Sequence, residues 1–205
     1  MKKLSLTKKI VTVAVLASIV GCETLPENVD TENDKGHAVM GLDYRDFNKA
    51  ASKMISSLLR SGRLKKRGGG MFVMCPGRIV NDTNQRIDTS QLMAKIEEEL
   101  LNSGLITMTS AVGADGATDE MVMKTRALRG SSEFKQNTIA KKGTILAPDL
   151  SISGKILQRD INYDSKKTQI EYYFQLKITD LNSGTRFWQK EEVLAKRGSA
   201  KSVSW

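Results

Sequence analysis

The feature that most narrows the choice of fold is a regular alternation of apolar and polar side chains between residues 170 and 179. The two sets are Ile170, Tyr172, Phe174, Leu176 and Ile178 on one side, and Glu171, Tyr173, Gln175, Lys177 and Thr179 on the other. Successive side chains of a strand point to opposite faces, so this period of two predicts a strand with one buried face. The rest of the chain must therefore supply elements that cover an apolar sheet surface.

Other segments extend this strand into a sheet. The predicted strands are residues 71–80, 105–109, 150–156, 170–179 and 187–195. Turn-forming residues at 162–167 and 180–184 join the last three strands into an antiparallel meander. Pro76-Gly77 interrupts the first strand, and these residue types mark bulges or edges in sheets.

Two segments with apolar residues at helical spacing are predicted to cover the sheet. Their apolar residues are Phe47, Ala50, Ala51, Met54, Ile55, Leu58 and Leu59 in the first segment, and Leu92, Met93, Ile96, Leu100 and Leu101 in the second. Asp43 is placed to cap the first helix, and Asp88 or Thr89 the second. Both helices are expected to end at a serine-glycine pair, Ser61-Gly62 and Ser103-Gly104.

The remaining segments complete the prediction of the fold class. Residues 118–129 and 133–141 are predicted to form two further helices, and Glu97-Glu98-Glu99 is predicted to be the solvated face of the second helix. Helices mixed with an antiparallel meander indicate an α+β fold, in which an antiparallel or mixed sheet is flanked by helices on one face.

The N-terminus has the pattern of an export signal. Four lysines lie in the first nine residues, and residues 10–20 form an apolar run about half as long as the roughly 20 residues that span a bilayer. Residues 1–21 are therefore predicted to be a signal peptide. Ile19-Val20-Gly21-Cys22 looks like a lipobox, so Cys22 is predicted to be the first mature residue and to carry a lipid that holds the protein at a membrane. The alternative is a signal anchor with a chance cysteine.

Charge divides the mature chain into a tether and a domain. Residues 22–38 are acidic and lack an apolar pattern, and we expect a disordered tether that reaches at most about 55 Å. The formal net charge of +9 belongs to residues 39–205, because the signal and the tether cancel. Glu23 stands directly after Cys22, where an aspartate would favour the inner membrane. We therefore expect an outer-membrane anchor facing the periplasm, with the inner membrane as the alternative because the tether is short.

The residue types exclude several kinds of site. The single histidine, His37, lies in the tether, and Cys75 is the only cysteine besides Cys22. A Ser-His-Asp or Cys-His centre needs a histidine held by a rigid scaffold, and a zinc site needs more such ligands. Gly68-Gly69-Gly70 lacks the residues of a phosphate loop, and Cys75 is expected to be a buried apolar residue. We therefore expect no catalytic residue, no metal site, no cofactor and no enzymatic activity.

A basic run is the one distinctive charge feature of the domain. Its candidate partner-contact residues are Arg63, Lys65, Lys66 and Arg67. Such a run would favour nucleic acid inside a cell, but export removes that partner. Anionic lipid heads, the acidic cell-wall polymer and an acidic protein surface remain as partners, and a simple solvated loop is the alternative.

Three segments of the domain resemble the LpoB family of outer-membrane lipoproteins, which activate a class A penicillin-binding protein. These segments are Val39 to Phe47 continuing to Leu58-Leu59, Arg78 to Thr83 with Ile87-Asp88-Thr89, and the helix with Leu92, Ile96 and Leu100 that ends at Ser103-Gly104. The resemblance implies a fold like the N-terminal domain of TolB, without catalysis or cofactor. It implies a regulator that binds the synthase and raises its glycan-polymerising and peptide-crosslinking activity.

Two other functions stay open at this point. A lipoprotein of a secretion or envelope assembly is one, because TolB-like domains also occur there, and a structural peptidoglycan-associated lipoprotein is the other. The matched segments resemble core, caps and turns. Asn81-Asp82-Thr83, for example, is expected to form a turn and not a docking site.

Overall fold

The computed structural model describes residues 28–31 and 33–199. The chain divides into two units, one ending at Ala38 and the other beginning at Val39. The described part of the first unit consists of turns and irregular backbone, whereas the second holds every described helix and strand. None of these helices is long and apolar enough to cross a bilayer. Cys22 and the start of the tether lie outside the described residues.

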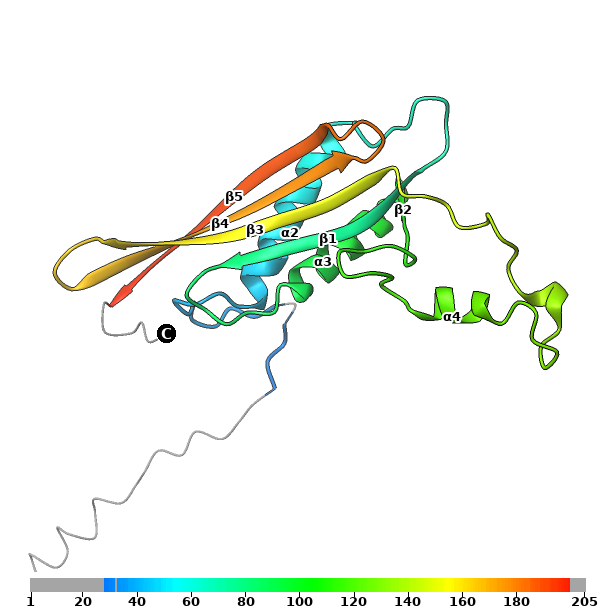
Figure 1. The fold of residues 1–205 in the computed structure, drawn as a ribbon. Coiled ribbons are helices and arrows are strands. Elements are labelled where there is room, and N and C mark those ends of the chain that lie inside the picture. The colour runs from blue at the N-terminus through cyan, green and yellow to red at the C-terminus, as the bar shows by residue number, and fades with distance from the viewer. Residues whose placement is uncertain (1–27, 32, 200–205) are drawn as a thin grey trace, which may run out of the picture. The chain divides into compact units, whose positions relative to one another are not determined.

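Five strands of the second unit form one mixed sheet in the order β2-β1-β3-β4-β5 (Figure 1). They are β1 (Phe72–Asp82), β2 (Ile106–Met108), β3 (Leu150–Asn162), β4 (Lys167–Asp180) and β5 (Arg186–Ser199). Strand β1 runs parallel to β2 and β3, while β3, β4 and β5 form an antiparallel meander. The predicted meander and the predicted fold class are both confirmed.

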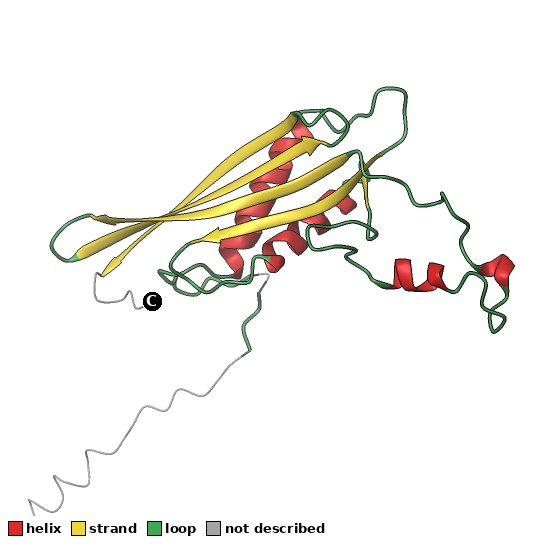
Figure 2. Ribbon diagram, viewed as in Figure 1, coloured by secondary structure: helices red, strands yellow, loops and turns green. Residues whose placement is uncertain are grey.

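Two helices, α2 (Tyr44–Arg60) and α3 (Ser90–Asn102), cover one face of this sheet (Figure 2). The layer between helices and sheet is filled by fully buried side chains, among them Met54, Ile55, Leu58, Ile96, Leu100, Ile152, Ile156, Tyr172 and Phe174. All five apolar residues of the alternating segment in β4 are buried there, as the sequence predicts. Phe47 of α2 meets Phe174 edge to face, with ring centroids 6.2 Å apart.

Both helix starts use the expected residues. The Asp43 carboxylate accepts a hydrogen bond from the Asp46 backbone N–H at 3.3 Å, and the Asp46 carboxylate accepts one from the Asp43 N–H at 2.9 Å. This reciprocal pair is a capping box, so the predicted capping role of Asp43 is confirmed, with Asp46 as its partner. Thr89 occupies the cap position of α3, but the Asp88 carboxylate accepts the Ser90 N–H, and the Thr89 hydroxyl donates to the Ile79 carbonyl instead.

Both helix ends use the same chemistry. The Ser61 hydroxyl donates to the Leu58 carbonyl at 2.6 Å, and the Ser103 hydroxyl donates to the Leu100 carbonyl at 2.6 Å. Each serine is followed by a glycine with φ of +66°, a conformation that favours glycine over other residues. The serine-glycine stops are therefore confirmed.

Strand β1 runs through Pro76-Gly77 without a break, but its register against β3 shifts between Pro76 and Ile79. Gly77 sits where a Cβ atom would lie 2.7 Å from the Ile152 carbonyl oxygen. The bulge therefore brings the two backbones closer than a side chain allows.

The long connection from β2 to β3 differs from the prediction. Helix α4 spans only Met121–Ala127, and residues 133–141 contain only a short 3₁₀ turn at Gln136–Thr138. No residue from Thr107 to Asp149 is buried, so the segment lacks the apolar contacts that would extend its helices. The prediction of two full helices here is wrong.

A polar network fixes the start of the domain onto the sheet. The buried Tyr172 hydroxyl donates to the Met40 carbonyl at 2.9 Å and accepts from the Gln85 amide at 2.6 Å, while Gln85 accepts the Leu42 N–H at 2.9 Å. On β5, the Lys196 ammonium donates to the Gly41 carbonyl and to Asp46. Burial is the main cause that raises the pKa of Tyr172, so the hydroxyl stays protonated and remains a donor.

Candidate docking surface

The face of the sheet opposite α2 and α3 is the main open surface of the domain. Register places the second set of β4 side chains here, from Gln169 and Glu171 to Lys177 and Thr179. These side chains are exposed or half-buried, in contrast to the buried set on the helix side. A sheet with one solvated face has room for a partner on that face.

An apolar row crosses this open face. Leu157, Tyr173 and Val193 are direct cross-strand partners on β3, β4 and β5. Val193 is 43% exposed, and the other two side chains are half-buried. Next to the row, the Tyr173 hydroxyl donates to the Glu171 carboxylate at 2.6 Å, which lowers the pKa of Glu171 and raises the pKa of Tyr173. The row thus places aliphatic and aromatic area in the middle of a polar face, and such side chains are typical of the centres of protein interfaces.

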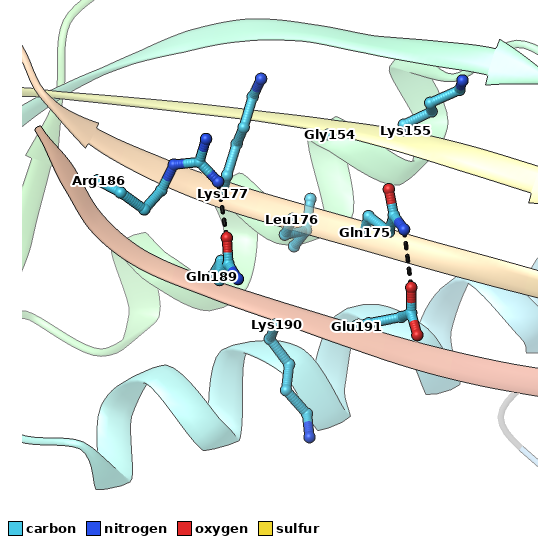
Figure 3. Close-up of a pocket in the computed structure, with 9 residues that line it drawn as sticks. All are labelled: Gly154, Lys155, Gln175, Leu176, Lys177, Arg186, Gln189, Lys190 and Glu191. Carbon is cyan, nitrogen blue, oxygen red and sulfur yellow. Dashed lines mark hydrogen bonds between the residues drawn. The ribbon is translucent and has the colours of Figure 1, made fainter. Parts of the chain in front are cut away.

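A hollow of about 610 Å³ lies beside the row, over β3, β4 and β5 (Figure 3). Its charged lining residues are Lys155, Lys177, Arg186, Lys190 and Glu191. Figure 3 shows two hydrogen bonds along its wall, from Gln175 to Glu191 at 2.7 Å and from Arg186 to Gln189 at 2.7 Å. Lys155, Lys177 and Arg186 lie on the open face near the carboxylate of Glu191, whereas Lys190, which is opposite Leu176, points to the helix side. The three cations make the hollow attractive to an acidic surface or ligand.

The structure separates the four residues of the basic run. The Arg63 guanidinium donates to the Phe187 carbonyl at 2.9 Å, and the Lys66 ammonium lies 2.8 Å from the Asp149 carboxylate and 5.3 Å from the Phe72 ring centroid. Lys65 and Arg67 are exposed and remain for a partner.

Two contacts hold the loop that carries the basic run against the domain. Leu64 is only 2% exposed and holds the loop to the core, a role that the charged residues around it hide in the sequence. The hydrogen bond with Lys66 is the main cause that lowers the pKa of Asp149. The hydrogen bond from Arg63 to the Phe187 carbonyl fixes the loop to the start of β5, the strand that also carries Arg186.

The other residues singled out in the sequence lie in the core, on α3 and in a loop. Cys75 is buried as expected, and burial raises the pKa of its thiol. Among the residues that the structure describes, no cluster of histidine, cysteine and acidic side chains would hold a metal.

The prediction of a solvated face at Glu97-Glu98-Glu99 is confirmed for Glu98 and wrong for the other two, which are half-buried. Burial raises the pKa of Glu97, and Glu99 accepts a hydrogen bond from the Ser52 hydroxyl. The prediction of a turn at Asn81-Asp82-Thr83 is wrong for its first two residues, because Asn81 and Asp82 end β1 and pair with β3. The Asn81 side chain instead organises the loop that follows, since its amide donates to the Gln85 carbonyl and its oxygen accepts the Thr83 N–H.

Comparison with known proteins identifies one family. Residues 46–194 match the family model described as peptidoglycan-synthase activator LpoB. A search of curated protein sequences finds no match.

Several solved structures have a similar arrangement of elements. The LpoB C-terminal domain from Escherichia coli is 13% identical with a TM-score of 0.44, over 74% of this chain and 99% of that domain. The equivalent domain from Salmonella enterica is 13% identical with a TM-score of 0.41, over 73% and 98%. Lipoprotein GNA1162 from Neisseria meningitidis is 9% identical with a TM-score of 0.34, over 65% and 87%.

Proposed function

The chain belongs to the LpoB family of peptidoglycan-synthase activators, and on that premise we propose that it binds a class A penicillin-binding protein and stimulates it. The observation that carries this proposal is the extent of the family match. It begins in α2 and ends in β5, so it takes in the mixed sheet and both covering helices. The activator has no reaction of its own to perform: it stabilises the active conformer of the synthase by binding that conformer more tightly.

The open face of the sheet is the proposed contact surface. Leu157, Tyr173 and Val193 would form its buried centre, and the cations of the hollow and of the basic loop its rim. Apolar and aromatic groups at the centre of an interface set the lifetime of a complex, whereas rim charges mostly set the rate of association. We therefore expect the synthase to present an acidic surface to this face.

The test measures glycan polymerisation by the class A penicillin-binding protein of the same organism, with and without residues 39–205. We expect stimulation by the native domain and no product from the domain alone. Val193→Asp should abolish binding and stimulation, because it places a charge at the centre of the interface. Val112→Asp is the matched control, since Val112 is also 43% exposed but lies in the loop after β2. Absence of stimulation by the native domain, or equal loss in both variants, contradicts the proposal.

We also propose that the protein is held in the cell envelope by a lipid on Cys22, with residues 1–21 removed and residues 22–38 as the tether. The anchor would lie in the outer membrane and face the periplasm. Cys22→Ser should give an unprocessed precursor that no longer incorporates labelled palmitate, because the thiolate is the acceptor of the lipid. Equal labelling of the native protein and the variant would refute the assignment.

A further inference from the structure

The connection between β2 and β3 contains an ordered arm, residues 121–148, that extends away from the sheet and helices (Figure 1). One glutamine organises its turn. The Gln136 amide donates to the carbonyls of Leu128, Ser131 and Phe134 at 3.3, 2.6 and 3.0 Å, and its oxygen accepts the Gly130 N–H at 2.9 Å. The arm therefore has a defined backbone although it contributes nothing to the core.

Two arginines hold the limbs of the arm together. Arg129 donates twice to the Ala140 carbonyl, at 2.8 and 2.6 Å, and Arg126 donates to the Lys141 carbonyl at 3.0 Å and the Thr144 hydroxyl at 3.1 Å. These bonds bring α4 beside residues 140–144. Polar contacts thus fix the shape of the arm, and its apolar side chains are not needed to hold it together.

Those apolar side chains face solvent. Met121, Met123, Phe134 and Leu146 are 55%, 54%, 48% and 68% exposed. Met123 lies one helical turn before Arg126, on the same side of α4, and Arg126 reaches the residue that precedes Ile145 and Leu146. The contacts therefore gather apolar groups from both limbs, an arrangement that marks an interaction site.

The arm is also strongly basic. Residues 121–148 carry six cations, Lys124, Arg126, Arg129, Lys135, Lys141 and Lys142, against the single acid Glu133. Lys135, Lys141 and Lys142 are exposed, whereas the two arginines are used internally. Apolar groups that enter the acyl boundary, together with lysines that meet anionic head groups, are the features of an interfacial membrane-binding segment.

We propose that this arm binds the surface of an anionic lipid bilayer, with its apolar side chains inserted and its lysines at the head groups. The length of the tether favours this occupant over a distant protein surface. Residues 23–38 reach at most about 55 Å, so a lipid on Cys22 would hold the domain close to a bilayer throughout its life. That the domain lies near a bilayer rests on the proposed lipid anchor. The ability of the arm to bind a bilayer does not depend on that anchor.

The experiment uses residues 22–205 with Cys22→Ser, so that no lipid is attached, and measures co-sedimentation with vesicles. We expect binding to phosphatidylcholine vesicles that contain phosphatidylglycerol, little binding to phosphatidylcholine alone, and loss of binding at high salt. Replacing Lys135, Lys141 and Lys142 with Ser should weaken binding about a hundredfold, because each surface lysine contributes a factor of about five. Replacing Met123, Phe134 and Leu146 with Ser should abolish insertion without unfolding the domain, because none of the three is in the core.

The matched control replaces Lys65 and Arg67, two exposed cations outside the arm, with Ser, and should change binding by no more than about twofold. No binding of the native chain to the anionic vesicles overturns the proposal. An equal effect of the control overturns it too, because the net charge would then be responsible. Synthase stimulation, measured in detergent without vesicles, separates the two proposals. Arm variants should keep it, and arm variants that lose it while still binding vesicles would show that the arm docks on protein.

Discussion

Tyr172 and Tyr173 are neighbours in the sequence, but they belong to opposite surfaces of β4. The hydroxyl of Tyr172 is buried among Gln85 and the backbone of Met40, while that of Tyr173 bonds Glu171 on the open face. The period of a strand thus gives one tyrosine a structural role and leaves the other for a partner.

Tyr172→Phe should lower the free energy of unfolding by about 1–2 kcal/mol, because it leaves the half-buried Gln85 amide and Met40 carbonyl without their partner. Tyr173→Phe is the control and should change it by less than about 0.5 kcal/mol, because Glu171 keeps access to water. Urea unfolding followed by circular dichroism measures both. Similar losses would mean that the network at the start of the domain does not stabilise it.

At the scale of elements, the bulge in β1 determines how the strand meets β3. Gly77→Ala should destabilise the domain by about 2–3 kcal/mol, because the added methyl group would approach the Ile152 carbonyl and backbone cannot move aside as a side chain does. Gly69→Ala is the control: nothing lies within 4 Å of the added atom, so only its φ of +88° costs about 1 kcal/mol. Thermal unfolding measures the melting temperatures of the two variants. Equal decreases would show that the bulge does not require glycine at residue 77.

The elements also show which parts of the structure the sequence could predict. Helices α2 and α3 follow from local chemistry, since an aspartate cap and a serine-glycine stop lie within a few residues of each apolar segment. The arm at 121–148 does not, because its shape depends on Gln136 and Arg129 reaching carbonyls up to eleven residues away. The parallel pairing of β1 with β3 joins residues more than seventy positions apart, and no local pattern encodes such a pairing.

The docking surface was predictable only in part. The basic run was visible, but its division into structural and exposed cations depends on Asp149 and Phe187, which are distant in the sequence. The apolar row on the open face was hidden because Tyr173 and Val193 look like ordinary members of two different strands. Register alone makes them neighbours.

At the scale of the whole molecule, the positive charge of residues 39–205 should speed the encounter with an acidic synthase. Replacing Lys65 and Arg67 with Ser should slow association by at most about tenfold at low salt, flatten its salt dependence and leave the dissociation rate nearly unchanged. Stability should not change, because both residues are exposed. Lys66 is left intact, since its ion pair with Asp149 and its contact with Phe72 contribute to the fold.

Surface plasmon resonance at two ionic strengths measures these rates. If the variant associates as fast as the native domain at both salt concentrations, Lys65 and Arg67 are merely solvated and do not assist binding. A faster dissociation would instead place the loop at the centre of the interface, in conflict with the open-face assignment.

The network at Met40 also has a mechanical meaning. A protein tied to a membrane at one end and bound to a synthase at the other feels a pull along its tether whenever the two move apart. Tyr172, Gln85 and Lys196 hold the first residues of the domain to β4, β5 and the loop before α3, so such a force would be shared by several bonds before it reached α2. These bonds would carry the force at the junction, so the first helix would stay packed while the tether is stretched.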